Sequence, residues 1–188
     1  MAVTRIIYTG TVHLGIWGPL DRRCAAATDA LEALIGKRGT DAFGRDPRHD
    51  HITASGFVVS PDRRRVLLMH HAKLDRWLQP GGHCDGSANT LEVARRELRE
   101  ETGLSQARLV TRAIVDIDRH LIPARRDEPA HHHVDLRYLF EADPALPISR
   151  NQESRALAWV EIDRLEAYTD NPALLVIRTI AEEHPARA

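Results

Sequence analysis

Three glutamates fall on one predicted helical turn in the segment RRELREETGL, residues 95–104. Glu97, Glu100 and Glu101 are spaced three and four residues apart, so a helix places their side chains on one face. Carboxylate oxygens are the ligands that Mg²⁺ and other hard divalent cations prefer. Two interpretations are open: the turn is a solvated acidic surface paired with nearby arginines, or it holds a divalent cation together with phosphate oxygens of a substrate.

The residues before this turn favour the metal interpretation. Gly81–Gly82 forms a flexible turn whose backbone can approach a ligand closely. Asn89 is suited to cap a helix, and Glu92, three residues later, completes a pair like a capping box. The pattern therefore predicts a helix over residues 90–102 that ends at Gly103.

The full stretch GGHCDGSANTLEVARRELREETGL resembles the Nudix box, the signature of Nudix hydrolases. That signature is a glycine, five residues, a glutamate, seven residues, and then Arg-Glu-apolar-any-Glu-Glu-any-Gly-apolar. Over residues 82–104 the matching positions are Gly82, Arg96, Glu97, Leu98, Glu100, Glu101, Gly103 and Leu104. One position departs, because Ala88 stands where the signature has its first glutamate. This departure leaves open a smaller number of metals, a different loop shape or a lower activity.

The resemblance extends outside the box to about residues 51–183. The family's Trp-any-Pro-Gly-Gly entry is matched by RWLQPGGH, which contains Trp77, and Glu153 precedes the strand-like segment ALAWVEI. The longer run from HITAS to HHHVDLRYLF is similar to a bacterial subgroup of the family. The resemblance implies an α/β fold, the Nudix α/β/α sandwich with a mixed β-sheet, over residues 51–188, preceded by an N-terminal extension of residues 1–50.

The resemblance also implies an activity. Nudix enzymes hydrolyse a phosphoanhydride, usually in a nucleoside diphosphate linked to another group, with Mg²⁺ or Mn²⁺ as cofactor. Arg96 would orient the carboxylates by a salt bridge, and Glu97 and Glu153 are two candidates for the general base. The expected metal ligands are Gly82, Glu97, Glu100 and Glu101.

Four further residues are candidates for binding a nucleotide or another small diphosphate substrate. His83 directly follows the glycine pair and could contact a substrate phosphate. Arg125, next to Arg126 in the loop before His131, could bind a terminal phosphate, although a solvated loop is the alternative. Trp77 can stack on a base, although core packing is an alternative. Strand alternation places His133 on one face with His131 and Asp135, so a wall of a substrate cleft and a Zn²⁺ or Mn²⁺ site are both open.

Two other functions remain as alternatives. Ala88 is compatible with a Nudix-like module that binds a ligand without hydrolysing it. Cys84 lies close enough to the glycine pair to keep a relative of the prenyl-diphosphate isomerases in view, since such an enzyme needs a cysteine in its pocket.

The elements that must position these residues alternate between strand and helix patterns, which favours an α/β or α+β domain. We expect a helix from Asp21 to Ile35 that ends at Gly36, and a polar linker over residues 36–50. A loop is expected at 74–89 and another at 119–130. Strands are expected at 51–60, 64–71, 107–118, 131–142 and 157–162, a helical turn at 163–168, and a closing helix at 171–183 capped by Asn171.

Composition narrows the class of protein. The 188 residues are 43% hydrophobic, which suits one domain, and the net charge of −1 gives no signal for nucleic acid or an anionic membrane. The two cysteines form no CxxC pair, and no run reaches the roughly 18 apolar residues of a membrane span. We therefore expect a soluble cytoplasmic protein. The strand-like residues 5–17 are available for pairing in a homodimer.

Overall fold

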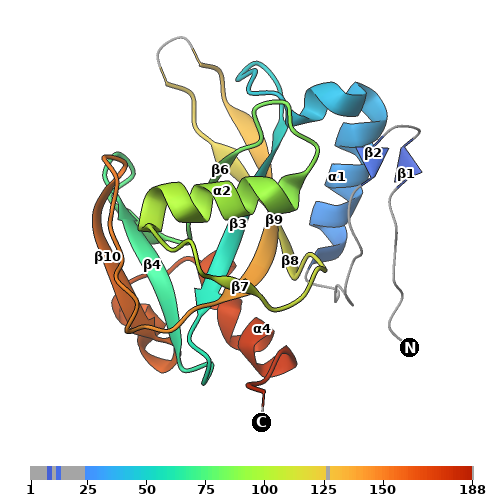
Figure 1. Ribbon diagram of the computed structural model, residues 1–188. Helices are drawn as coiled ribbons and strands as arrows, with labels where there is room; N and C mark the ends of the chain where they lie inside the picture. The colour runs from blue at the N-terminus through green and yellow to red at the C-terminus, as the bar shows by residue number, and fades with distance from the viewer. Residues whose placement is uncertain (1–7, 10–11, 14–23, 126–127, 188) are drawn as a thin grey trace. The chain divides into compact units, whose positions relative to one another are not determined.

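The computed structural model describes residues 8–9, 12–13, 24–125 and 128–187 (Figure 1). Its contacts divide the chain into two compact units, and three elements, β3 (His51–Val59), α2 (Thr90–Thr102) and β9 (His131–Glu141), run through both. Unit 1 contains the described residues of Met1–Ser55, Gly82–Ala94 and Arg112–Tyr138, and unit 2 those of Gly56–Gly81, Arg95–Thr111 and Leu139–Ala188.

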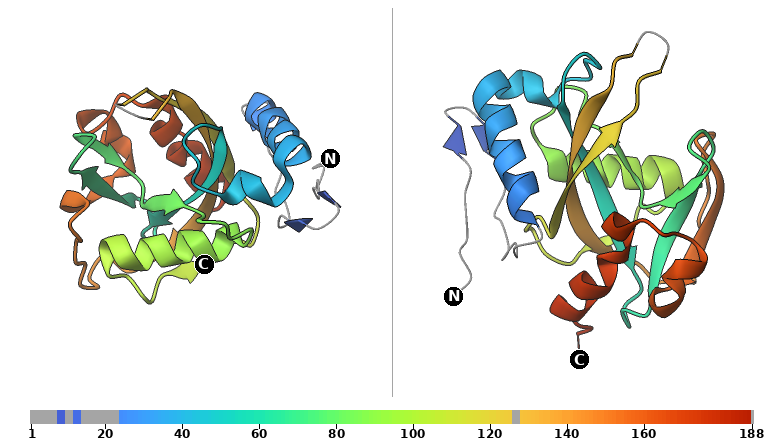
Figure 2. Two further views of the ribbon diagram at one scale, coloured as in Figure 1. Left: turned by 90° about the horizontal axis from the view of Figure 1, so that it is seen from above. Right: turned by 180° about the vertical axis from the view of Figure 1, so that it is seen from behind.

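Unit 1 is built on the first part of β9. Strand β8 (Asp116–Ile122) pairs with it antiparallel, and β6 (Gly81–His83) pairs with β3. Helix α1 (Ala25–Arg38) lies beside β8, as Figure 2 shows. Its buried side chains are Thr28, Leu31 and Ile35, and it is followed by the short helix η2 (Gly39–Phe43) with a fully buried Phe43.

A buried arginine joins the strands of unit 1. Arg137, with 3% of its side chain exposed, lies 3.0 Å from Asp116, 3.1 Å from Asp118 and 3.0 Å from Asp135. Burial alone would lower the pKa of Arg137, but the three carboxylates outweigh it and raise the pKa above its ordinary value. Asp135 also accepts hydrogen bonds from Thr53 and Ser55 of β3, so both of its carboxylate oxygens are hydrogen-bonded.

Unit 2 contains strands in the order β10-β4-β3-β9-β7. Strands β10 (Ser154–Glu161) and β4 (Arg65–His71) pair antiparallel and lie side by side in Figure 1. Strand β7 (Arg108–Leu109) pairs with the end of β9, and β5 (Arg76–Leu78) pairs with β4. The helices that follow are η3 (Ile162–Ala167), α3 (Pro172–Leu175) and α4 (Ile177–Glu183).

Most predicted elements are confirmed. Strands β3, β4, β9 and β10, helix α2 and the turn of η3 lie within a few residues of their expected positions. Asn89 Oδ1 lies 3.4 Å from the N–H of Glu92, and Asn171 Oδ1 accepts a hydrogen bond from Ala173 N–H at 3.0 Å. Both predicted helix caps are therefore present. Of residues 1–23, only the pair β1 (Tyr8–Thr9) and β2 (Val12–His13) is described, and the predicted cap Asp21 lies outside the described residues.

Several predicted boundaries are wrong. The expected loop at 74–89 contains β5 and β6, each only three residues long, because a strand this short leaves no alternation to detect. The expected strand at 107–118 is interrupted and forms β7 and β8, while the closing helix is divided into α3 and α4 at Val176. Helix α1 continues through Gly36, and the expected linker contains η2, because Phe43 is buried in unit 1.

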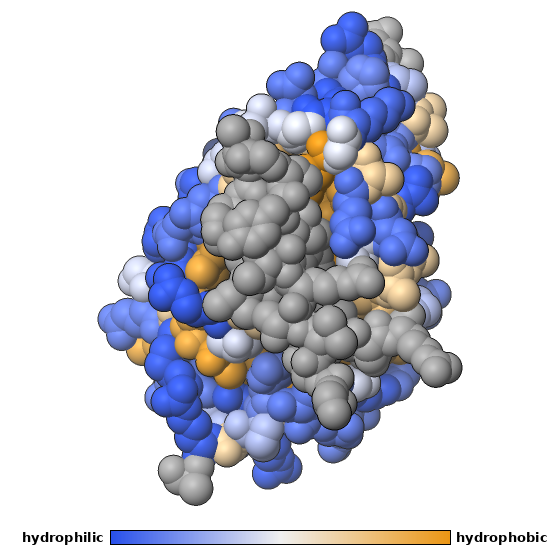
Figure 3. Space-filling model, turned by 90° about the vertical axis from the view of Figure 1, so that its right-hand side faces the viewer, coloured by the Kyte–Doolittle hydropathy of each residue, from blue (hydrophilic) through white to orange (hydrophobic). Residues whose placement is uncertain are grey.

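Within the described residues, no helix is both long and apolar enough to cross a membrane. The side shown in Figure 3 is mostly hydrophilic over its described residues, with smaller hydrophobic areas among them.

Candidate active site

The acidic turn of α2 lies in unit 2 and contains one deeply buried carboxylate. Glu101 is 3% exposed and accepts a hydrogen bond from the N–H of Gly81 at 2.8 Å. Burial raises the pKa of Glu101 to about 8; the Gly81 N–H opposes this, and the charges of Glu97, Glu153 and Glu100 add to it. Four carboxylates that the sequence singled out therefore influence one another within this unit.

Arg96 has the contact expected of an orienting residue. Its Nη2 atom lies 2.9 Å from Oε1 of Glu97, whose side chain is 14% exposed. Arg96 directly precedes Glu97 on α2, so the salt bridge limits the conformations that the Glu97 side chain can adopt. The arrangement matches the predicted pairing of an arginine with a carboxylate of the turn.

The two segments that approach the acidic turn are held by their backbones. Pro80, directly before the glycine pair, accepts a hydrogen bond from Gly56 N–H at 2.9 Å. Glu153 is exposed, but its carbonyl accepts from Ala72 N–H at 2.8 Å and its N–H donates to Asn151 Oδ1 at 2.9 Å. The Glu153 carboxylate therefore extends from an anchored loop.

These donors fit a hard divalent cation. Glu97, Glu100 and Glu101 supply only oxygen, the donor that Mg²⁺ and Mn²⁺ take in proteins. A buried carboxylate whose pKa is raised by neighbouring acids is also the group that a nearby cation would stabilise in its charged form. The chemistry of the site thus agrees with the cofactor expected from the sequence.

Trp77 also lies in unit 2, on the wall of an open cavity of about 360 Å³. Its ring stacks on His70 at 5.0 Å between centroids and meets Tyr168 edge-on at 5.3 Å. Trp77 and Tyr168 both line the cavity, together with the residues on either side of Tyr168, from 166 to 171. Trp77 is therefore half-buried beside open space, and not part of a closed core.

The other predicted substrate-binding residues lie in unit 1. His83 and His133 have ring centroids 5.1 Å apart. Burial, helped by the charge of Arg45, lowers the pKa of His83 to about 4, and burial with the neighbouring histidines lowers that of His133 to about 2, so both rings are neutral at pH 7. Arg125 is exposed in a tight turn, where its backbone exchanges hydrogen bonds with Glu128. Gly82, the second residue of the glycine pair, is the first residue of the unit 1 segment Gly82–Ala94.

Two aspects of the site depart from what the sequence suggested. Asp135 does not belong to the group of ligand atoms that contains His131 and His133, and its carboxylate instead accepts hydrogen bonds from Thr53, Ser55 and Arg137. His51, which the sequence analysis did not select, lies beside both histidines instead. A histidine at the start of a strand whose residues are all buried was the signal that could have indicated it. Cys84 and Tyr138 are each 2% exposed and belong to the core.

Comparison with known proteins agrees with this architecture. A family model described as the NUDIX domain matches residues 49–178. A probable DHNTP pyrophosphohydrolase of Lactococcus lactis is 31% identical over 94 residues, covering 49% of this chain and 54% of that protein. An asymmetrical bis(5'-nucleosyl)-tetraphosphatase of Rattus norvegicus is 31% identical over 99 residues, covering 52% of this chain and 64% of that protein. This chain thus spans less than two thirds of either relative.

A solved structure is similar over more of the chain. The crystal structure of a NUDIX-family hydrolase from Clostridium perfringens has a TM-score of 0.55 and 25% sequence identity. The similarity covers 71% of this chain and 96% of that one.

Proposed function

Because the chain belongs to the Nudix family, we propose that it is a pyrophosphohydrolase that cleaves a phosphoanhydride in a small nucleotide-like molecule. The substrate class is a nucleoside diphosphate linked to another group, or a related small diphosphate. Two similar proteins named as a pyrophosphohydrolase and a tetraphosphatase support this class of reaction. The observation that carries the proposal is the buried Glu101 carboxylate, held by Gly81 and surrounded by three further acids.

The residues proposed to hold Mg²⁺ or Mn²⁺ are Glu97, Glu100, Glu101 and the carbonyl of Gly82. A bound ion of this kind neutralises phosphate charge and lowers the pKa of a water molecule. The protein's own contribution is to fix the geometry. The Gly81 N–H holds Glu101 and Arg96 holds Glu97, so the carboxylates keep their positions without a cost in side-chain freedom during the reaction.

The general base is one of two acids. Glu97 and Glu153 both act electrostatically on Glu101, so both lie near the proposed reaction centre. Either carboxylate would accept the proton that the attacking water releases as its oxygen bonds to phosphorus. The bridging P–O bond of the anhydride would break at the same time, and the leaving phosphate group would keep the electron pair. Glu153 is exposed and its loop is anchored, which suits a group that reaches toward a substrate.

Recognition of the rest of the substrate is proposed for four residues. Trp77 would stack on a base, as its ring lies at the wall of an open cavity. Arg125 is the candidate for a charged contact with a terminal phosphate. His83 and His133 are neutral at pH 7, so they would contribute hydrogen bonds and no positive charge.

Substitution of Glu101 tests the proposed reaction. Phosphate release from a panel of nucleoside diphosphate derivatives is measured with Mg²⁺ or Mn²⁺ for the unmodified protein and for Glu101→Gln. We expect kcat to fall by at least about 100-fold, the lower end of what a positioned acid-base group contributes. The exposed Glu182→Gln in α4 is the matched control and should retain full activity.

A second outcome would favour a different function. Ala88 replaces the first glutamate of the family signature, and this favours a module that binds without hydrolysis as the alternative. Tight binding of a nucleotide with no turnover by the unmodified protein, under any metal tested, would replace the enzyme proposal with that module.

A further inference from the structure

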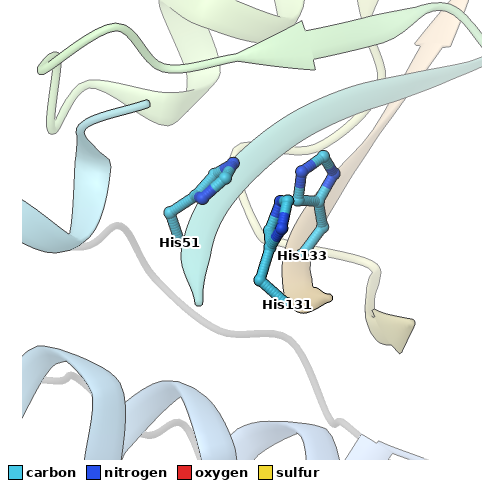
Figure 4. A group of neighbouring side chains, drawn as sticks. All are labelled: His51, His131 and His133. Carbon is cyan, nitrogen blue, oxygen red and sulfur yellow. The ribbon is translucent and has the colours of Figure 1, made fainter. Parts of the chain in front are cut away.

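Three histidines of unit 1 gather where two strands begin. His51 is the first residue of β3, and His131 and His133 open β9. One ring nitrogen of each lies within 4.8 Å of the others, and Figure 4 shows the three rings grouped together. The ring of His51 is 5.0 Å from that of His131 and 4.5 Å from that of His133, measured between centroids.

The hydrogen bonds of the His51 and His131 rings determine which nitrogen of each ring carries the proton and which keeps its lone pair. Nδ1 of His51 lies 3.0 Å from the carbonyl of His49, and Nδ1 of His131 lies 2.9 Å from the carbonyl of Pro129. A carbonyl only accepts, so each Nδ1 carries the proton and each Nε2 keeps its lone pair. Histidines that bind metals characteristically donate their other N–H to a carbonyl in this way.

His51 supplies an independent sign of a missing ligand. Its side chain is 1% exposed, and its buried Nε2 has no hydrogen-bond partner among the described residues. Buried polar atoms of this kind are rare in native proteins, and an ion is one of the standard explanations. The Nε2 atom thus lacks the partner that a cation would provide.

The donor atoms of the cluster favour a cation over an anion. Two of the rings direct their N–H to a backbone carbonyl, so the other nitrogen of each presents a lone pair, which binds a metal ion and repels a phosphate oxygen. Asp135, on the same face of β9, accepts hydrogen bonds from Thr53, Ser55 and Arg137 and is not part of the group, so the ligands that the group supplies are nitrogens.

We propose that His51, His131 and His133 form a binding site for a divalent transition-metal ion of the Zn²⁺ type. Three imidazoles suit Zn²⁺ and exclude Mg²⁺, which takes oxygen ligands. Tetrahedral bonds of about 2.1 Å require nitrogens about 3.4 Å apart, so small side-chain rotations close the site from its present spacing. His83 lies beside the group, with its ring centroid 5.2 Å from that of His51. The ion would join the starts of β3 and β9.

Titration with Co²⁺ tests the site directly. Protein without a polyhistidine tag is stripped with EDTA, and Co²⁺ is added in the presence of excess Mg²⁺, which occupies oxygen sites. We expect one equivalent to bind with the strong visible absorption of a tetrahedral nitrogen site, to be displaced by Zn²⁺, and to raise Tm. His133→Gln and His131→Gln should each weaken binding by about 100-fold or more.

Control variants and a measurement on the unmodified protein make the test decisive. His132→Gln, whose ring is bonded to Asp50 and lies outside the cluster, should bind Co²⁺ normally. Glu101→Gln should also retain the absorption, which separates this site from the proposed hydrolytic centre. Should the histidine variants fail to fold, the unmodified Co²⁺ protein is examined by NMR for paramagnetically shifted imidazole N–H signals. The proposal is overturned if those signals are absent, or if binding survives in the histidine variants.

Discussion

The same residue type takes different roles in α2 because each carboxylate has a different environment. Glu100 is exposed, Glu97 is held by Arg96, and Glu101 is buried against Gly81. Spacing in the sequence was sufficient to place these acids on one turn. It gave no indication of which one would be buried, because burial depends on the chain segment that covers the helix, here the glycine pair and the residues before it.

Arg96 provides a prediction at this scale. Arg96→Gln removes the 2.9 Å ion pair with Glu97, so we expect kcat to fall by about 10–100-fold and Mn²⁺ to bind more weakly. The Arg96 side chain is 37% exposed, so the free energy of unfolding should change by less than about 1 kcal/mol. Steady-state kinetics and denaturant unfolding measure the two effects. Arg99→Gln, exposed on the same helix, is the control; an equal loss in that variant would contradict an orienting role for Arg96.

At the scale of elements, regular patterns were predictable and pairing partners were not. Helix α2 and strands β3, β4, β9 and β10 follow their hydrophobic periodicity. Helix α1 continues beyond its predicted end at Gly36, because one glycine inside a helix costs only about 1 kcal/mol of stability. The helix ends before Gly39, which adopts a φ of 56°. The histidine cluster was partly missed for another reason: His51 and His133 are far apart in sequence and meet only because unit 1 places the strand starts together.

Two glycines at predicted helix ends should respond in opposite directions to alanine. Gly103 has a φ of 73°, and an added Cβ would lie 2.4 Å from Ser149 Oγ, so Gly103→Ala should reduce the free energy of unfolding by about 1–3 kcal/mol. Gly36 lies inside α1, and an added Cβ would meet no described atom within 4 Å, so Gly36→Ala should increase it by about 0.5–1 kcal/mol. Urea unfolding compares both variants. A destabilised Gly36→Ala would show that the helix does not continue through that position.

At the scale of the whole molecule, the chain separates two kinds of donor. Oxygen donors gather on the acidic turn in unit 2, and nitrogen donors gather at the strand starts in unit 1. Because hard cations prefer the first set and borderline transition metals the second, each proposed site selects its own ion without competition from the other. Family membership was accessible from the sequence, since it follows from a contiguous signature, and that signature also supplies most of the residues proposed for hydrolysis. The proposed second site was not accessible in this way, because its ligands come from two separate strands.

The acid stability of the molecule should depend on Glu141, at the end of β9. Arg63 Nη1 lies 2.5 Å and Arg108 Nη2 2.7 Å from its carboxylate oxygens. Burial raises the pKa of Glu141, but the hydrogen bonds from Arg108 and Arg63 outweigh it and hold the pKa below the ordinary 4.5. A depressed pKa in the folded state means that this stabilisation is complete above pH 4.5 and is lost as the pH falls through the folded value.

We therefore expect Glu141→Gln to lower the free energy of unfolding by about 1–2 kcal/mol at pH 7, with the difference from the unmodified protein closing below pH 4.5. Denaturant unfolding between pH 7 and pH 3 measures both quantities. Glu161→Gln is the matched control, because its ion pair with Arg65 is exposed on both sides and should contribute less than about 0.5 kcal/mol at any pH. If the difference in the free energy of unfolding between Glu141→Gln and the unmodified protein stays constant across this range, the effect of the substitution comes from packing and not from charge. If the difference disappears at low pH, the ionised carboxylate of Glu141 is what binds the two arginines, Arg63 from the β3–β4 turn and Arg108 from β7. That carboxylate of β9 would then help to hold the strands of unit 2 together.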